Sequence, residues 1–317
     1  VPARRAASQR HDSSGVAQSA KLYDVKVLDS EGVGTLSDVL EGIQWVIFHA
    51  REYNIRVMNL SLAAQSTESW LTDPLCIAVR RAAAAGVTVV VAAGNFGQSD
   101  SNREVYGAIS SPGNDPTVIT VGASNFKSTE ARSDDVVNNF SSRGPTRGAR
   151  VVAGVRVPDN LLKPDLVAPG NRIFGAAATR ASLLNASWNT LATLNPGLVT
   201  ATGASQNYLQ TLMMMSGTSI AAPSVAGTVA LMLQANPGLT PPLIKAILQY
   251  TAEPLPNANL LQQGAGLLNV DGAVTLAKVL RTDIASAVAA GTIKPGDAML
   301  APGRSMGLLR STIGGKS

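Results

Sequence analysis

The chain has 317 residues, of which 45% are hydrophobic and 15% charged, and it contains a single cysteine. This length is enough for one large hydrophobic core, and one cysteine excludes an internal disulfide framework and a cysteine-based metal cluster. The net charge is +5, but only 4% of the residues are aromatic and no basic patch is interleaved with aromatic residues. Nucleic acid is therefore not an expected partner. No apolar run is long enough to cross a bilayer, so no membrane partner is expected either.

The N-terminal region begins with a polar, basic segment. Residues 1–20 contain no apolar run of the kind found in signal peptides, and we expect little order there. Leu22–Leu28 alternates in part between polar and apolar residues, as a strand does. Apolar residues at helical spacing follow from Leu36 to Ala50, with Thr35 and Asp38 as a capping pair.

Strand and helix patterns alternate through the middle of the chain. Asp73 and Pro74 begin a helix that Gly86 ends, and Cys76 lies in its apolar pattern as a buried structural thiol. Three runs are predicted to be strands, the later two buried on both faces: Arg56–Leu62, Val87–Ala92 and Val118–Val121. This alternation predicts βαβ units and a mainly parallel sheet, which defines an α/β fold.

The C-terminal half is less regular. We expect loop-rich excursions over residues 144–162 and 176–210, and a tail or linker over residues 281–317, which are rich in Gly, Pro and Ser. Helices are predicted at residues 219–233, 240–249 and 268–280.

The stretch from Met214 to Gly227 combines a tight turn with an apolar helix. Small residues at 216–219 allow the turn, and Pro223 fits a helix if it lies in the first turn. Ser219 would then lie at the helix N-terminus, where backbone N–H groups are free and the helix dipole is positive. A hydroxyl there can attack a carbonyl while nearby N–H groups stabilise the oxyanion. The simpler alternative is an N-cap serine after a glycine turn.

The heptad Gly217–Pro223 resembles the nucleophile motif of the subtilisin-like serine proteases (subtilases, peptidase family S8). Other segments resemble blocks of that family in the same order along the chain: Tyr23–Thr35, Asn59–Leu62, Ala92–Asn95, Ser111–Pro116, Phe140–Pro145, Lys163–Gly170 and Gly264–Asn269. The related sedolisins place an acid at the oxyanion position, so Asn95 favours the subtilisin branch. The resemblance covers about Gly15 to Leu280. It implies a three-layer subtilisin-like α/β fold that lacks its N-terminal strands.

The resemblance also assigns residues to the site. Ser219 would be the nucleophile, and the side-chain amide of Asn95 would bind the oxyanion together with the backbone N–H of Ser219. The substrate would lie extended between two segments and contact the end of a third: Gly32, Val33 and Gly34; Ser61, Leu62 and Ala63; and Ala93 and Gly94. Ala63 stands where the family usually has glycine, which would narrow the primary pocket.

The family's other two catalytic residues, Asp and His, lie upstream of the Leu22 strand. His11 lacks the family's context and is only a weak candidate for the base, while His49 is expected on the surface. Asp24 and Asp29 fit a solvent-facing strand position and a turn. We therefore interpret residues 21–280 as the C-terminal portion of a peptidase domain that is truncated at its N-terminus.

This interpretation has structural and functional consequences. In the family the aspartate's strand lies between the Leu22 and Arg56 strands, so its loss predicts that those two strands pair directly. The predicted function is a serine endopeptidase that forms an acyl-enzyme and is impaired for lack of a base. The alternatives are a non-catalytic peptide-binding module and, more weakly, a fragment that never folds stably.

The remaining expectations concern partners and ligands. A polypeptide substrate is the expected partner, and the family resemblance favours a secreted, extracellular protein. No cofactor is required. The family often carries structural Ca²⁺ held by loop oxygens, and the loops near Asp12 and Asn114–Asp115 offer such oxygens. Their spacing specifies no site.

Overall fold

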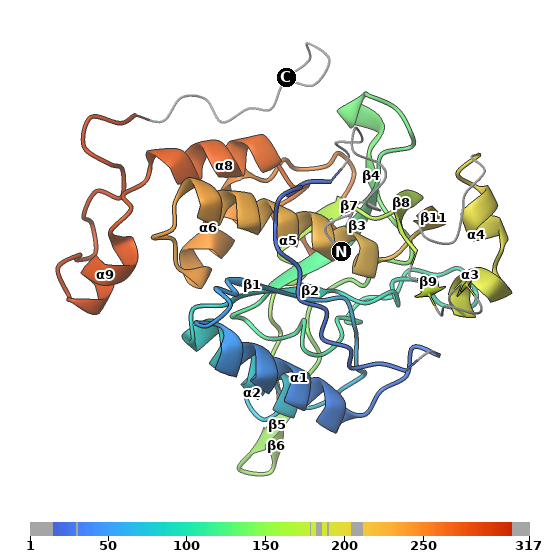
Figure 1. The fold of residues 1–317 in the computed structure, drawn as a ribbon. Helices are drawn as coiled ribbons and strands as arrows, with labels where there is room; N and C mark the ends of the chain where they lie inside the picture. The colour runs from blue at the N-terminus through green and yellow to red at the C-terminus, as the bar shows by residue number, and fades with distance from the viewer. Residues whose placement is uncertain are drawn as a thin grey trace.

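The computed structural model describes residues 15–29, 31–177, 179–181, 186–188, 190–203 and 212–305. A five-stranded sheet forms its centre (Figure 1). Four strands are parallel, in the spatial order β1 (Val57–Leu60), β2 (Thr88–Ala92), β3 (Ile119–Asn125) and β7 (Leu166–Pro169). The short β4 (Val136–Val137) pairs antiparallel with the end of β3. The predicted parallel α/β architecture is confirmed.

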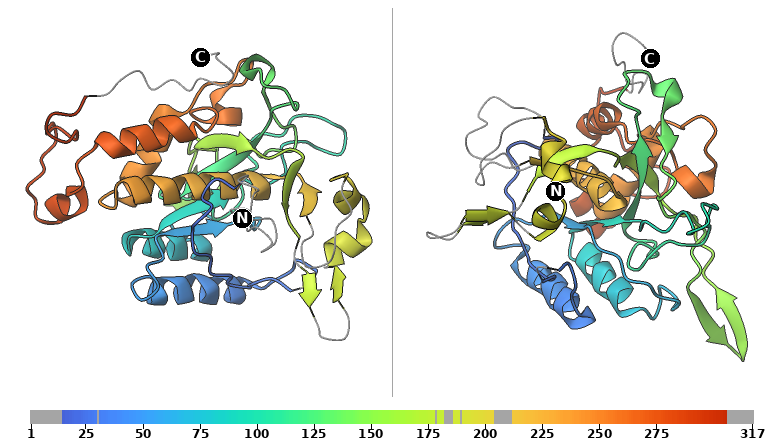
Figure 2. Two further views of the ribbon diagram at one scale, coloured as in Figure 1. Left: turned by 45° about the horizontal axis from the view of Figure 1, so that its top comes forward. Right: turned by 90° about the vertical axis from the view of Figure 1, so that its right-hand side faces the viewer.

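Helices cover both faces of the sheet, which gives three layers (Figures 1 and 2). On one face, α1 (Leu36–His49) and α2 (Pro74–Ala84) share a core with β1 and β2. On the other face, α5 (Thr218–Ala235), α6 (Pro241–Thr251) and α8 (Val270–Val279) pack over β3 and β7. By length and composition α5 could span a membrane, but 61% of it is buried in this core.

Two predicted helix starts are confirmed in atomic detail. Asp38 N donates to Thr35 Oγ1 at 3.2 Å, and Thr35 N donates to Asp38 Oδ2 at 2.8 Å, which forms a capping box at α1. At α2, Asp73 Oδ1 accepts from the backbone N–H of Leu75 at 2.9 Å and of Cys76 at 3.2 Å. Cys76 is fully buried, as predicted.

The predicted strand over Leu22–Leu28 is absent, and its predicted pairing with the Arg56 strand is wrong. Val25 and Val27 instead pack beside α1. A Cβ built on Gly42 would lie 2.5 Å from Val27 Cγ1, so only glycine lets the segment approach the helix this closely. These valines are partly buried there, and among the described strands β1 pairs only with β2.

The N-terminal expectation of disorder fails for the part of residues 1–20 that the structure describes. Ala17 is buried, and Val16 lies against Gly227 of α5, where an added Cβ would be 3.0 Å from Val16 Cβ. Val16 and Ala17 are therefore packed on the central helix, while residues 18–20 are exposed. Residues 1–14 lie outside the described part.

The two expected loop excursions contain regular structure. The first includes an antiparallel hairpin of β5 (Ala149–Val152) and β6 (Val155–Pro158). The second, with the strand that precedes the α5 turn, holds two further strand pairs and two short helices: β8 (Ile173–Ala176) with β11 (Leu212–Met215), β9 (Thr179–Ala181) with β10 (Ala186–Trp188), α3 (Thr190–Leu194) and α4 (Gly197–Thr200). A 3₁₀ turn, η1 (Arg132–Asp134), precedes β4.

The region predicted as a tail is partly folded. After α7 (Leu260–Gln263) and α8, a further helix α9 (Ile284–Ala289) buries Ile284 in the main core. An isolated antiparallel bridge joins Leu280 to Leu300. The tail expectation is thus wrong for much of residues 281–305, while residues 306–317 lie outside the described part.

Candidate active site

Ser219 is the second residue of α5, directly after a glycine turn. Gly217 has a φ of 152°, which residues with a side chain rarely adopt, and its N–H donates to Gly170 O at 2.8 Å beyond the end of β7. In the first turn of α5 the N–H groups of Thr218 and Ile220 have acceptors, whereas Ser219 N has none in the described chain. The predicted helix N-terminal position of Ser219 is confirmed.

Pro223 lies deeper in the helix than the first-turn position considered from the sequence. It is the sixth residue of α5, so the N–H that would normally bond to the carbonyl oxygen of Ser219 is missing. The hydroxyl of Ser61 fills this place and donates to Ser219 O at 2.8 Å. Asn59 Nδ2 in turn donates to Ser61 Oγ at 2.9 Å. The segment after β1 is thereby bonded to the backbone of the nucleophile.

Asn95 follows the end of β2 and is fixed by Thr218. Asn95 Oδ1 accepts from Thr218 N at 2.9 Å and from Thr218 Oγ1 at 3.1 Å. Thr218 Oγ1 also accepts from Gly94 N at 3.2 Å. With its oxygen held in this way, Asn95 turns its Nδ2 donors away from Thr218, and they have no acceptor among the described residues.

Two donors converge beside Gly217. A Cβ built on that residue would lie 3.5 Å from Asn95 Nδ2 and 3.7 Å from Ser219 N. Both donors therefore lie beside the space that the absent side chain of glycine leaves open, and Asn95 Oδ1 lies 3.8 Å from the same point. An oxygen atom carrying negative charge is the group that two such donors stabilise.

The segment Ser61–Ala63 follows β1 and has an unpaired backbone. Its three residues take no part in any backbone hydrogen bond of the described structure, and Ala63 is exposed. Ala93 and Gly94 differ. Their carbonyl oxygens accept from Ser110 N at 3.1 Å and from Ser142 N at 2.9 Å, and their N–H groups are also engaged. Position 94 also requires glycine, because an added Cβ would lie 2.5 Å from Ser110 Oγ.

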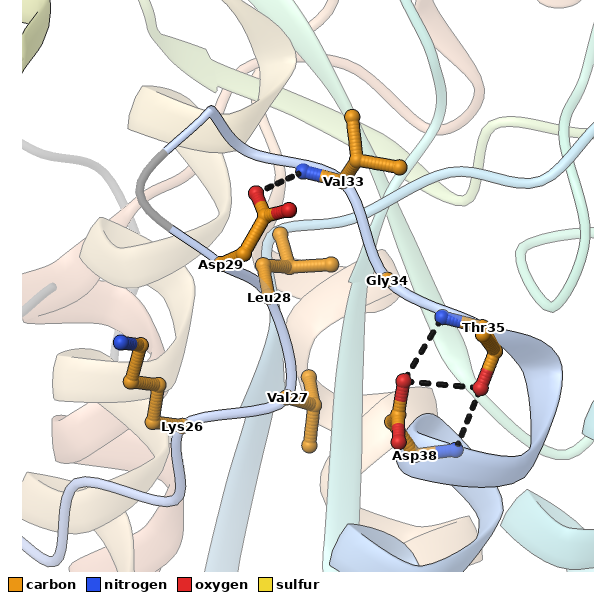
Figure 3. A pocket seen from close by; sticks show the side chains of 8 residues that line it. All are labelled: Lys26, Val27, Leu28, Asp29, Val33, Gly34, Thr35 and Asp38. Atoms are coloured by element: carbon orange, nitrogen blue, oxygen red, sulfur yellow. Dashed lines mark hydrogen bonds between the residues drawn. The ribbon is translucent and has the colours of Figure 1, made fainter.

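The predicted residues Gly32, Val33 and Gly34 lie in a turn that Asp29 organises. Asp29 Oδ1 accepts from the N–H of Glu31 at 2.9 Å and of Val33 at 3.0 Å, which lowers the pKa of Asp29. Around this turn lies an open depression of about 400 Å³, lined by Lys26, Val27, Leu28, Asp29, Val33, Gly34, Thr35 and Asp38 (Figure 3). Among the three predicted residues, the backbone of Gly34 alone makes no hydrogen bond within the described structure.

Among the described residues, none of the histidine and acid candidates forms a hydrogen bond or ion pair with Ser219. His49 is stacked between Trp45 and Tyr53, its Nδ1 lies 2.9 Å from Trp45 O, and its Nε2 lies 4.0 Å from Glu52, so it is less exposed than expected. His11 lies outside the described residues, and Asp24 is exposed. In the described part of the chain the Ser219 hydroxyl has no hydrogen-bond partner, so no base contacts it there.

The oxygens considered for calcium are engaged by the protein where the structure describes them. Asn114 Oδ1 accepts from Cys76 Sγ at 3.1 Å, and Asp115 pairs with Arg80 at 3.2 Å. Burial raises the pKa of Asp115. Among the described residues, no group of three or more His, Cys, Asp or Glu residues is arranged to hold a metal ion. Asp12 lies outside the described residues.

A buried charge cluster at the start of β7 was not predicted from the sequence. Asp165 Oδ2 pairs with Lys163 Nζ at 2.7 Å, and Asp165 Oδ1 pairs with Lys245 Nζ at 2.9 Å. Desolvation lowers the pKa of Lys163 to about 8, whereas the two lysines hold the pKa of Asp165 below its usual value. The opposite charges at 163 and 165 are a sequence signal for an ion pair. The third member of the cluster, Lys245, lies 80 residues beyond Asp165, so the sequence does not indicate it.

Comparison with known proteins agrees with this geometry. The profile of the subtilase family (Peptidase_S8) matches residues 4–272. The serine protease AprX of Bacillus subtilis is 35% identical over 277 residues, which cover 84% of this chain and 54% of AprX. The M-protease of Shouchella clausii is 32% identical over 82% of this chain and 49% of that protein. The chain therefore spans about half the length of these relatives.

Solved structures are similar as well. A cold-adapted subtilisin-like serine proteinase matches with a TM-score of 0.50 and 28% identity, over 80% of this chain and 67% of that one. A protease from Pseudoalteromonas arctica PAMC 21717 matches with a TM-score of 0.55 and 26% identity, over 83% and 65%. Sequence profile, relatives and fold agree, and the chain belongs to the subtilase family.

Proposed function

We propose that this chain carries the nucleophile and oxyanion site of a serine endopeptidase. Ser219 Oγ attacks the scissile carbonyl of a polypeptide, and the substrate carbonyl oxygen becomes an oxyanion between Asn95 Nδ2 and Ser219 N. Collapse of this tetrahedral intermediate expels the amine and leaves an acyl-enzyme ester on Ser219, which water then hydrolyses. The observation that carries the proposal is the convergence of these two donors beside Gly217.

Substrate binding follows from the free backbone of Ser61–Ala63. An extended peptide pairs with these residues by adding a strand, and the turn around Gly34 offers a second edge. The two edges would hold the peptide with its scissile bond over the start of α5. Ala93 and Gly94 form part of the wall of the substrate site but do not pair with the peptide, because their backbone groups already bond within the protein.

The chemistry uses only side chains and backbone of the protein, and no cofactor takes part. Its weak point is proton transfer. No base contacts the Ser219 hydroxyl within the described residues, so the hydroxyl keeps the pKa of an ordinary alcohol. We therefore infer impaired turnover by this chain, with residual rate from binding and the oxyanion site. Secretion to the extracellular space fits the relatives and is part of the same proposal.

An activated substrate tests the proposal, because a p-nitrophenyl ester of a short peptide needs less help from a base than an amide does. Incubation of the purified chain should give acyl-enzyme on Ser219, detected as a mass increase of the intact protein. Ser219→Ala should abolish it, and Ser133→Ala, which changes an exposed serine in η1, should not. Acylation that survives Ser219→Ala would overturn the assignment.

The second candidate is a peptide-binding module without turnover, favoured by the unpartnered Ser219 hydroxyl. It predicts that a fluorescent extended peptide binds the chain while neither ester nor amide is cleaved. Binding should weaken when Ser61–Ala63 is altered, for example in Ala63→Pro, which removes one free N–H. Ester turnover lost in Ser219→Ala excludes this candidate.

A further inference from the structure

The hairpin β5–β6 projects from the body of the molecule beyond α2 (Figure 2). The two strands make extensive contacts only with each other. The turn residues Ala153 and Gly154 have φ values of 50° and 79°, the pattern of a tight two-residue hairpin turn. The tip of the hairpin therefore stands in solvent.

The root of the hairpin is firmly attached, in contrast to its tip. Ala149 N donates to Thr67 O at 3.1 Å, and Ala149 O accepts from Ser69 N at 3.1 Å. Asp159 accepts from Ser69 Oγ at 2.6 Å and from Trp70 N at 3.0 Å. A rigid base presents the tip in a fixed direction.

Four valines make the outer hairpin apolar. Val151 is 72% exposed, Val155 63%, Val152 47% and Val157 38%. Val152 pairs with Val155 next to the turn, and strand alternation puts Val157 on their face, whereas Val151 lies on the other face opposite Arg156. An isolated two-stranded hairpin has no core in which to bury such residues, and the exposed apolar patch of Val152, Val155 and Val157 marks an interaction surface.

Arginines flank these valines. Arg150 lies opposite Val157, Arg156 lies opposite Val151, and Arg147 precedes the hairpin. All three are exposed, and none forms an ion pair within the described chain. Residues 147–158 contain no acid. Of the described residues, two acids lie at the root and none near the tip: Asp159 bonds to Ser69 and Trp70, and the exposed Glu68 forms a β-bridge with Ala149.

We propose that this hairpin docks on an anionic lipid surface. Its convex, apolar tip suits insertion between lipid headgroups, and arginines behind the tip reach the phosphates and carboxylates at that depth. A second copy of the chain fits less well, since pairing two hairpins brings like charges together. A purely polyanionic partner would leave the valines exposed. The expectation of no membrane partner concerned spanning segments, and a peripheral contact needs none.

Vesicle co-sedimentation of the full chain tests the proposal. Vesicles of phosphatidylcholine with about 30% phosphatidylserine should bind at least about ten-fold more protein than pure phosphatidylcholine vesicles at about 0.1 M salt. Raising the salt should weaken binding, because the arginine contribution is screened. Each arginine contributes about a five-fold change in partitioning, so Arg150→Gln with Arg156→Gln should lower it about 25-fold.

The apolar contribution is tested separately. Val151→Thr, Val152→Thr and Val155→Thr together keep the β-branched shape and should abolish most binding without changing the thermal transition. Two control variants should bind as the wild type does. Arg103→Gln with Arg304→Gln removes equal charge elsewhere, and Val288→Thr removes one exposed valine elsewhere.

Three outcomes would overturn the proposal. The first is equal binding to both vesicle types, and the second is binding that the hairpin variants leave unchanged. The third is a concentration-dependent dimer in sedimentation velocity that the triple threonine variant loses, which would assign the hairpin to a second copy of the chain.

Discussion

Ser61 and Pro223 act on the same atom, the carbonyl oxygen of Ser219. The proline removes the helical donor and the serine hydroxyl replaces it at 2.8 Å. The carbonyl is thereby tied to the segment after β1 that we propose to bind substrate. Substrate segment and nucleophile are thus joined by one hydrogen bond between residues far apart in sequence.

A double-mutant cycle measures this coupling. Ser61→Ala leaves Ser219 O without its donor and should lower the free energy of unfolding by about 1–3 kcal/mol. With Pro223→Ala present, a helical N–H can serve Ser219 O, so Ser61→Ala should cost distinctly less. Urea unfolding of the four proteins gives the coupling energy. Strictly additive effects would show that the two residues do not share this oxygen.

The amide of Asn95 is predicted to act in the transition state. In subtilisin, loss of one such oxyanion donor lowers the rate about 10²- to 10³-fold, or about 3–4 kcal/mol. Asn95→Ala should reduce the rate of ester acylation at Ser219 by a similar factor, with peptide affinity little changed. Asn139→Ala, at an exposed asparagine with no side-chain hydrogen bond in the described structure, is the matched control. An equal loss in both variants would speak against an oxyanion role.

At the scale of elements, helices α1 and α2 differ in how much stability their N-cap residues contribute. The Thr35 cap of α1 is exposed, whereas Asp73 of α2 is buried and also accepts from Ser111 Oγ at 3.0 Å. Removal of Asp73 leaves three donors without an acceptor in a buried site. The N-cap of α2 is therefore expected to contribute more to stability than the N-cap of α1.

Matched alanine variants should reveal this difference. Thr35→Ala should cost about 1 kcal/mol of unfolding free energy and speed hydrogen exchange mainly in the first turn of α1. Asp73→Ala should cost more, about 2–4 kcal/mol, because the buried Leu75 N, Cys76 N and Ser111 hydroxyl lose their partner. Thermal unfolding of both variants provides the comparison, and equal losses would contradict it.

Elements with local signals could be predicted from the sequence, and elements fixed by distant contacts could not. The caps at Thr35 and Asp73 and the buried β2 strand depend on adjacent residues. The Leu22–Leu28 segment has strand-like alternation, yet its conformation is decided by Gly42, which admits Val27 against α1. The sequence predicts a loop where the β5–β6 hairpin forms, because its valines follow no pattern that indicates a buried face.

The candidate site divides in the same way. The Gly217–Pro223 motif predicts Ser219 at a helix start, and the resemblance of the Ala92–Asn95 block to the family assigns Asn95. The bond from Ser61 to Ser219 O joins residues 158 positions apart, and no local pattern encodes it. Likewise, nothing near Ala93 indicates that Ser110 occupies its carbonyl oxygen.

At the scale of the whole molecule, one buried carboxylate serves two ammonium groups. Asp165 has two lysines and Gln249 around it, while Lys163 shares its single counter-ion with Lys245. Desolvation therefore outweighs attraction for Lys163, and its pKa falls from 10.5 to about 8. The cluster ties β3 and β7 to α6, so its protonation state bears on global stability.

The sign of the pH effect follows from proton binding. Between pH 8 and pH 10.5 the unfolded chain holds a proton on Lys163 that the folded chain has released, so this group makes stability rise with pH. Cys76 acts in the opposite direction. Burial raises the pKa of its thiol, so above about pH 9 the unfolded chain alone loses that proton and stability falls.

A difference measurement separates these opposing effects. Lys163→Met keeps the length of the side chain but removes its titration, and it leaves Cys76 unchanged. Urea unfolding of wild type and Lys163→Met at about pH 7.5 and pH 10 gives the pH-dependent change in stability of each protein. The wild type should gain stability relative to the variant between these values, because only the wild type sheds the buried charge on Lys163. The reverse sign would mean that Lys163 is held charged by Asp165 with a pKa above its value in the unfolded chain.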